Sequence, residues 1–164
     1  MPTKKNAVEF EEVTETTDMA VADNGEQMPA VSMEQVMSAN GNFLNTMNLA
    51  TNEGKITTIN ALNNAMSLKD AKDTVLDICD CITTPGTRKG RNGMPDTECQ
   101  NTYLIDTEGN AWFTQSDGIA RSAKMIAMMF PDFGKSTTDG CLHIKVDERQ
   151  LANGNTIKNL VIDA

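Results

Sequence analysis

The sequence lacks the features that identify membrane-spanning and disulfide-linked proteins. Apolar residues make up 39% of its 164 positions, and no run approaches the roughly 20 consecutive apolar residues that a transmembrane helix needs. Glutamates follow Lys4 and Lys5, where a signal peptide would have its apolar stretch. Four cysteines are too few for a disulfide scaffold in a chain of this length, so we expect reduced thiols. These absences predict a soluble protein of the cytoplasm.

Motifs of catalysis are also missing from the sequence. His143 is the only histidine, and no serine or cysteine motif beside it indicates a hydrolytic triad. The sequence has no Walker loop, no dinucleotide fingerprint and no pair of carboxylates that spacing alone singles out. We therefore expect a binding protein and not an enzyme, and we predict no cofactor.

Charge is distributed unevenly along the chain. The formal charge of −9 argues against nucleic acid as a partner, because lysine and arginine supply phosphate contacts. Residues 1–40, however, hold eight of the acids against two lysines, and they lack the apolar periodicity of a packed segment. We predict a disordered acidic tail over residues 1–40. It is either a solubilising leader or a docking segment for replication proteins that competes with nucleic acid for a basic groove.

The first part of the remaining chain, residues 41–164, predicts short elements and one long strand. Alternating apolar residues in Ile56–Ala61, after a turn at Asn52-Glu53-Gly54, predict an opening hairpin. Ser67 is a good N-cap for a short helix. The β-branched run Thr74–Thr84 predicts a long strand that ends at the turn Pro85-Gly86.

Two hairpins and one substantial helix are predicted after this strand. Residues 100–106 and 111–115 flank a turn, residues 118–130 have helical spacing of apolar residues, and residues 141–146 and 156–162 form a second alternating pair. From residue 74 the order is strand, strand, strand, helix, strand, strand. This is the order of the five-stranded oligonucleotide/oligosaccharide-binding (OB) barrel. The predicted fold class is mainly β: an OB-like barrel with its helix between strands 3 and 4, plus the N-terminal hairpin.

The predicted loop between the first two barrel strands, residues 85–95, is basic. It holds Arg88, Lys89 and Arg91 between glycines, and in OB barrels this loop is one of the elements that contact nucleic acid. We predict that these three side chains bind phosphates. The alternative is an ordinary solvated loop.

Aromatic residues that could stack on bases are few. We expect Glu108-Gly109 to form a two-residue turn, which pairs Tyr103 with Thr114 and places Tyr103 and Trp112 on one face of the hairpin. We predict that this face is exposed and that the two rings stack on bases, since both carry polar groups. A slip of one residue in the turn reverses the assignment, and Trp112 as a core residue is the alternative.

The cysteines allow another interpretation. Cys79 and Cys81 lie two residues apart, as do Cys141 and His143, so each pair shares one face of a predicted strand. Because strands 1 and 4 of the barrel are neighbours, the four side chains could form a Cys₃His zinc site. Against this, the spacing is shorter than in most zinc sites, and free cysteines commonly pack in cores.

The order of these features resembles the single-stranded DNA-binding proteins of small tailed bacteriophages that replicate by protein priming. The resemblance covers about residues 50–164 and rests on the following features: Glu53-Gly54-Lys55-Ile56, Asn60-Ala61, the strand Val75–Ile82, the hairpin Tyr103–Phe113, the helix after it, and Asn153-Gly154-Asn155. It implies a sequence-independent protein that coats displaced strands in the host cytoplasm during replication. It also implies an aromatic binding role for Trp112 and Tyr103.

The chain departs from this family in its methionine-rich helix, its basic loop and the N-terminal position of its acidic tail. The alternative function is that of a phage structural or host-directed protein whose β domain binds another protein. The sequence leaves homo-oligomer formation open.

Overall fold

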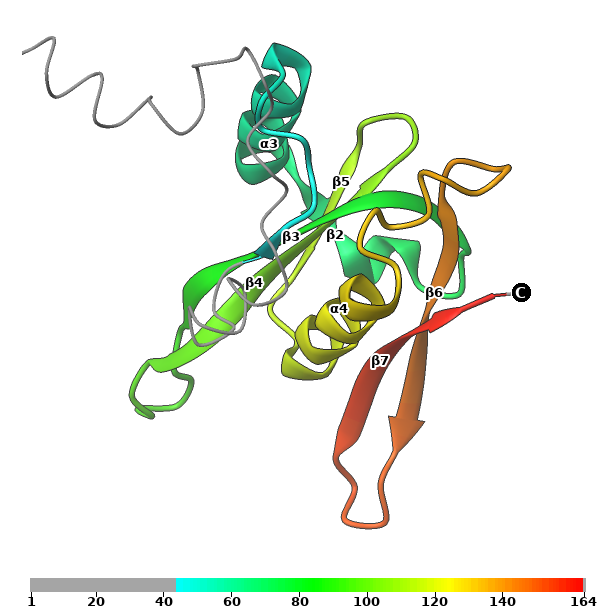
Figure 1. Cartoon of the computed structure of the whole chain (residues 1–164). Helices are drawn as coiled ribbons and strands as arrows, with labels where there is room; N and C mark the ends of the chain where they lie inside the picture. The colour runs from blue at the N-terminus through cyan, green and yellow to red at the C-terminus, as the bar shows by residue number, and fades with distance from the viewer. Residues whose placement is uncertain (1–43, 164) are drawn as a thin grey trace, which may run out of the picture.

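The computed structural model describes residues 44–163, and the predicted acidic tail lies outside the described residues. The described chain is mainly β, with a curled mixed sheet that forms an open half-barrel around α4 (Figure 1). None of its helices is long and apolar enough to cross a membrane. The elements in chain order are β1 (Leu44–Asn45), α3 (Asn52–Asn64), β2 (Met66–Ser67), the 3₁₀ helix η1 (Leu68–Ala71), β3 (Leu76–Arg88), β4 (Thr97–Asp106), β5 (Ala111–Thr114), α4 (Asp117–Met129), β6 (Leu142–Gln150) and β7 (Thr156–Ile162).

The sheet has the strand order β2-β5-β4-β3-β6-β7, and β1 pairs with β3 beside this path. All pairs are antiparallel except β2 with β5. The five predicted barrel strands are therefore present as β3 to β7, with α4 between the third and the fourth. Two further short strands and a second α-helix also occur, so the prediction of five strands and one helix is incomplete. Within the described chain β5 does not pair with β7, and the sheet stays open.

The prediction of an opening hairpin at Ile56–Ala61 is wrong, because this segment belongs to α3. Thr51 is the N-cap, and its hydroxyl accepts a hydrogen bond from the Gly54 amide at 3.1 Å. The side of the helix that is at least partly buried carries the small residues Gly54, Thr58 and Ala61, spaced by four and three positions. The larger β-branched residues lie mostly in solvent. The alternating apolar pattern at Ile56–Ala61 is therefore not the pattern of a half-buried strand.

The long strand is confirmed, but it does not end at Pro85-Gly86. Instead β3 continues to Arg88, and Pro85 pairs with Gln100 of β4. On the other side of β3, β6 pairs only with Leu76–Ile78. Within the described chain no strand pairs with Pro85 on that side, so the lack of an amide hydrogen in proline breaks no hydrogen bond between strands there. The predicted basic loop 85–95 is accordingly shorter, and Arg88 lies on a strand.

The predicted two-residue turn at Glu108-Gly109 is also wrong. Four residues, 107–110, connect β4 to β5, with Gly109 at φ +86°. The register places Leu104 opposite Trp112 and Tyr103 opposite Phe113. Tyr103 and Trp112 therefore lie on opposite faces of the sheet, which is the one-residue slip that reverses the predicted assignment.

Both faces of the central strands are covered. The concave face packs against α4 through a large core that includes Ile78, Cys81, Leu104 and Ile119. The opposite face carries a smaller cluster of Met47, Ala61, Ile82, Tyr103, Ile105 and Ala111, to which α3 contributes. The two covered faces explain why β3 has four consecutive buried residues, 80–83, where a one-sided strand would alternate.

The predicted short helix and the predicted long helix are both confirmed. Ser67 caps η1 by accepting the Lys69 amide at 3.3 Å. Ser116 caps α4 in the same way through the amide of Ile119.

Candidate functional site

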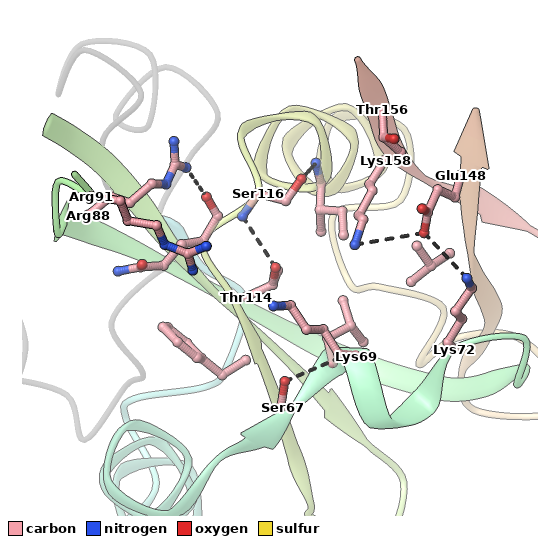
Figure 2. A pocket seen from close by; sticks show the side chains of 15 residues that line it. Ser67, Lys69, Lys72, Arg88, Arg91, Thr114, Ser116, Glu148, Thr156 and Lys158 are labelled. Carbon is pink, nitrogen blue, oxygen red and sulfur yellow. Dashed lines mark hydrogen bonds and ion pairs between the residues drawn. The ribbon is translucent and has the colours of Figure 1, made fainter. Parts of the chain in front are cut away.

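A cleft of about 670 Å³ opens beside the ends of several elements, and Figure 2 shows its side chains. Five of the residues that line it are basic and one, Glu148, is acidic, in a chain that has 14 bases and 23 acids overall. We call this the basic cleft, and its bases are Lys69, Lys72, Arg88, Arg91 and Lys158. Its walls come from η1, the end of β3, the segment 113–116, the start of α4, and the β6-β7 hairpin.

The acid in the cleft is shared between two lysines. The Glu148 carboxylate lies 3.9 Å from the Lys72 ammonium and 3.7 Å from the Lys158 ammonium (Figure 2). Partly exposed pairs of this kind are weak, so a competing anion can replace the carboxylate at low cost. The side chains of Lys69 and Arg91 have no hydrogen-bond or ion-pair partner within residues 44–163. The cleft therefore presents an excess of positive charge.

The three predicted phosphate-binding residues separate in the structure. Arg88 and Arg91 line the cleft. The Arg88 guanidinium donates to the Gln115 carbonyl and lies 3.4 Å from the Asp117 carboxylate, which fixes its direction. Lys89 is not part of the lining: its side chain is 88% exposed and its ammonium lies 3.0 Å from Asp96.

Asp96 holds the loop between β3 and β4 in shape. Its carboxylate accepts the Gly90 amide at 2.9 Å and the Lys89 ammonium at 3.0 Å. These two hydrogen bonds, the one from the Gly90 backbone first, lower the pKa of Asp96. The loop that carries Arg91 is thus pinned at its base while the Arg91 side chain remains free to contact a ligand.

Neither predicted stacking residue lines the basic cleft. Tyr103 is buried in the smaller apolar cluster. Trp112 is half-buried against the large core, and its indole nitrogen donates to Asp106 at 3.1 Å. Among residues 44–163, Phe113 is the one aromatic residue that lines the cleft, and its ring centre lies 5.2 Å from that of Tyr103. Phe113 thus shares the face of Tyr103, packs against the smaller apolar cluster and is only partly buried at the border of the cleft.

Sequence reasoning missed Lys69, Lys72 and Phe113 as members of the site. The two lysines follow the confirmed cap at Ser67, but their position in the cleft depends on the parallel pairing of β2 with β5. That pairing joins segments more than 40 residues apart, and no local pattern reports it. Phe113 was missed because the predicted turn pairs Tyr103 with Thr114, whereas the structure pairs Tyr103 with Phe113, a shift of one residue.

The predicted Cys₃His site is not assembled. Cys81 is fully buried in the large core, and a register shift in β3 beside Cys79 breaks the shared face that the spacing implied. Burial, the largest cause, raises the pKa of Cys79 to about 11. The side chains that come together are instead Asp77, Cys141 and His143, each with one candidate ligand atom within 4.8 Å of the others.

His143 in this group lies between two carboxylates. Its Nδ1 is 2.8 Å from Asp77 Oδ1, and its Nε2 is 3.1 Å from Asp139 Oδ2. These hydrogen bonds, the one with Asp77 first, raise the pKa of His143.

Comparison with models of protein families, with curated proteins and with solved structures found no match for this chain.

Proposed function

We propose that the chain is a sequence-independent single-stranded DNA-binding protein that holds the strand in the basic cleft, and that it is not an enzyme. The observation that carries the proposal is the gathering of five bases around one cleft in an acidic chain. Phosphates supply most of the affinity in sequence-independent binding, and they require such a cationic surface. Coating of displaced strands during phage replication rests on the family resemblance alone.

The strand order supports an OB-type barrel that is open on one side. The strands follow the sheet order β5-β4-β3-β6-β7, with the first and fourth barrel strands as neighbours. OB folds bind nucleic acid with the face of strands 2 and 3 and with the loops between strands 1 and 2 and between strands 4 and 5. Here β5 contributes Phe113, the first of these loops contributes Arg91, and Thr156 lies at the end of the second.

In the proposed mechanism the DNA phosphates lie along the lysine and arginine side chains of the cleft. One or more nucleobases turn out of the stack of the strand. Arg88 and Arg91 contact phosphates on one side of the cleft, and Lys69 contacts them from η1. Lys72 and Lys158 exchange their shared Glu148 for phosphate oxygens. The Phe113 ring offers a platform for a base, an interaction worth roughly 1 to 3 kcal/mol.

The first test measures the fluorescence anisotropy of labelled oligo(dT) during titration with the full chain, from low to high salt. For single strands the logarithm of the affinity falls with the logarithm of the salt concentration by about 0.7 per phosphate contact. We expect tight binding at low salt and a steep slope. Arg91→Ala should weaken binding roughly fivefold, as loss of about 1 kcal/mol implies, and reduce the slope by about 0.7.

Lys89→Ala is the matched control, because Lys89 lies in the same loop and has the same charge but pairs with Asp96 and does not line the cleft. It should change affinity far less than Arg91→Ala. Equal losses in both variants would mean that only the net charge of the loop matters. No binding of oligo(dT) at low salt would remove the proposal and favour a role in binding other proteins.

That second candidate function has its own observation. The helix α3 exposes Ile56, Ile59 and Leu62, three apolar residues at spacing three, and the first two are each 58% exposed. An apolar stripe that residues 44–163 leave exposed is typical of a surface that contacts another chain. Self-association measured by analytical ultracentrifugation, and lost in Ile59→Ser, would favour a structural or interaction role.

A further inference from the structure

A mixed group of candidate metal ligands lies at the end of β3 opposite to Arg88. Asp77 of β3 and His143 of β6 are register partners across the two strands. Cys141 precedes His143 by two residues, which directs both side chains to the same side of the chain. The strand pairing therefore brings together a carboxylate, an imidazole and a thiol from segments more than 60 residues apart.

The three residues are held in place by their surroundings. Cys141 is buried, and the Thr137 hydroxyl donates to its carbonyl at 3.2 Å. Gly134 packs so closely that a side-chain carbon there would lie 2.7 Å from the Cys141 backbone. On the other flank, the Asp163 amide donates to the His143 carbonyl at 2.8 Å. These contacts hold both ligand-bearing backbones in place, so the adjustment that binding of an ion requires would fall on the side chains.

We propose that Asp77, Cys141 and His143 bind a divalent metal ion of the zinc class. Each offers one ligand atom, and these atoms lie within 4.8 Å of one another. Around a tetrahedral zinc ion with bonds of roughly 2.0 to 2.3 Å, neighbouring ligand atoms lie roughly 3.3 to 3.8 Å apart, so the three side chains must close in by about 1 Å to bind the ion. In the proposed site the metal takes the place of the proton between Asp77 and His143 Nδ1, while Asp139 accepts the hydrogen bond from Nε2–H.

The chemistry of the ligand set indicates which metal it would take. One sulfur, one nitrogen and one oxygen suit zinc and cobalt, whereas calcium and magnesium require oxygen ligands only. A carboxylate that holds the far nitrogen of a ligating histidine is a common feature of zinc sites, and Asp139 stands in that position. A water molecule would complete the tetrahedron.

The consequence for the protein is a clamp between β3 and β6. The two strands pair over only three residue pairs, from Leu76–Ile144 to Ile78–Leu142, which is the shortest contact between long strands of the sheet. A metal ion that binds the folded chain and not the unfolded chain stabilises this junction by mass action. The basic cleft shares no residue with the site, so the two proposals stand independently.

The test is titration of the full chain with Co²⁺ under reducing conditions, followed by visible and near-ultraviolet absorption. We expect one equivalent to bind, with a thiolate-to-cobalt charge-transfer band and the visible spectrum of tetrahedral cobalt. Zn²⁺ should displace it and raise the melting temperature. The charge-transfer band should disappear in Cys141→Ser, and binding should weaken at least tenfold in His143→Ala and Asp77→Asn.

Cys79→Ser is the matched control, since Cys79 belongs to the same strand as Asp77 but not to the proposed ligand set. It should bind Co²⁺ with an unchanged spectrum. Loss of the band in Cys79→Ser would overturn this ligand set. Absence of stoichiometric binding to the natural chain would overturn the proposal and leave His143 as a histidine held by two carboxylates. His143→Ala and Asp77→Asn change partly exposed side chains, so circular dichroism should show them folded.

Discussion

At the scale of single residues, Asp106 organises more of the structure than any sequence pattern indicated. Its carboxylate accepts hydrogen bonds from the amides of Glu108 and Asn110 at 3.0 and 2.9 Å, which shapes the turn between β4 and β5. The same carboxylate accepts the Trp112 indole N–H at 3.1 Å. The turn thereby supports the register in which Trp112 lies on the face of the large core and Tyr103 and Phe113 lie on the opposite face.

We predict that Asp106→Ala destabilises the protein by about 1 to 3 kcal/mol, since it leaves a partly buried indole N–H and turn amides without partners. Chemical denaturation with urea measures this loss. Asp70→Ala, at an exposed acid of η1, is the control and should stay within about 0.5 kcal/mol of the natural chain. Affinity for oligo(dT) in folded Asp106→Ala should be unchanged. A selective loss of binding would move the interface to Trp112.

Asp96 carries a pH dependence. Its pKa is lowered in the folded state, so its contribution is present above the ordinary pKa of an aspartate and is lost as pH falls through the folded pKa. We predict that the loop 89–96 loosens in that acidic range while the sheet persists. Nuclear magnetic resonance titration should show a low Asp96 pKa and faster exchange of the Gly90 amide below it. A pKa that stays low in Lys89→Ala identifies the backbone hydrogen bond as the larger cause, and an ordinary pKa in the natural chain would contradict the prediction.

At the scale of elements, the sequence predicted correctly the helix that has a strong N-cap residue and a face of large apolar side chains. α4 follows its Ser116 cap, and its buried residues Ile119, Ala123 and Ile126 have the predicted spacing. α3 was mistaken for a strand because its packed face is made of small residues, which give little hydrophobic signal. The strength of a sequence pattern thus depended on the size of the side chains that the element buries.

Gly118, in the first turn of α4, touches β7. A side-chain carbon at this position would lie 2.1 Å from the Lys158 carbonyl oxygen, which belongs to the backbone. We predict that Gly118→Ala lowers stability by about 1 to 3 kcal/mol and also weakens oligo(dT) binding, since helix and strand must separate beside the cleft.

Alanine favours the helix more than glycine does, so helix propensity alone would make Gly118→Ala more stable. A loss of stability therefore identifies the clash with the Lys158 carbonyl oxygen as the cause. Arg121→Ala, at an exposed position of the same helix, should change neither quantity measurably. An equal or higher melting temperature for Gly118→Ala would show that α4 and β7 have room for a methyl group between them, and it would contradict the prediction.

At the scale of the whole molecule, the open half-barrel creates the site. Because β5 and β7 do not pair within the described chain, side chains from η1, β3, β5 and β7 meet around a space that a closed sheet would fill. The cleft of this open sheet is lined by five basic side chains and one acidic side chain, although the total charge of the chain is −9. For the proposed ligand, a single DNA strand, long-range attraction would depend on this local field and on salt.

We predict that the amide resonances perturbed by oligo(dT) form one group around the basic cleft, including Lys69, Arg91, Phe113 and Thr156. Two-dimensional nitrogen–proton spectra at low salt measure this. Resonances of Asp77 and His143, at the far end of β3, should shift little and act as the internal control. Perturbations centred on Tyr103 and Trp112 would contradict the prediction and favour the stacking residues predicted from the sequence.

The sequence by itself determined the β-rich class, the five principal strands and their order with α4, and the basic character of the segment around Arg88. These features depend on side-chain periodicity and on capping residues, which act within a few positions. Only the tertiary structure decided the hairpin register, the inward place of Tyr103, and the meeting of Lys69, Arg91 and Lys158. Each of these depends on pairings between distant strands, whose free energy comes from burying both faces of the sheet at once. No local pattern contains that information, so the chemistry of the site became visible only when the sheet was assembled.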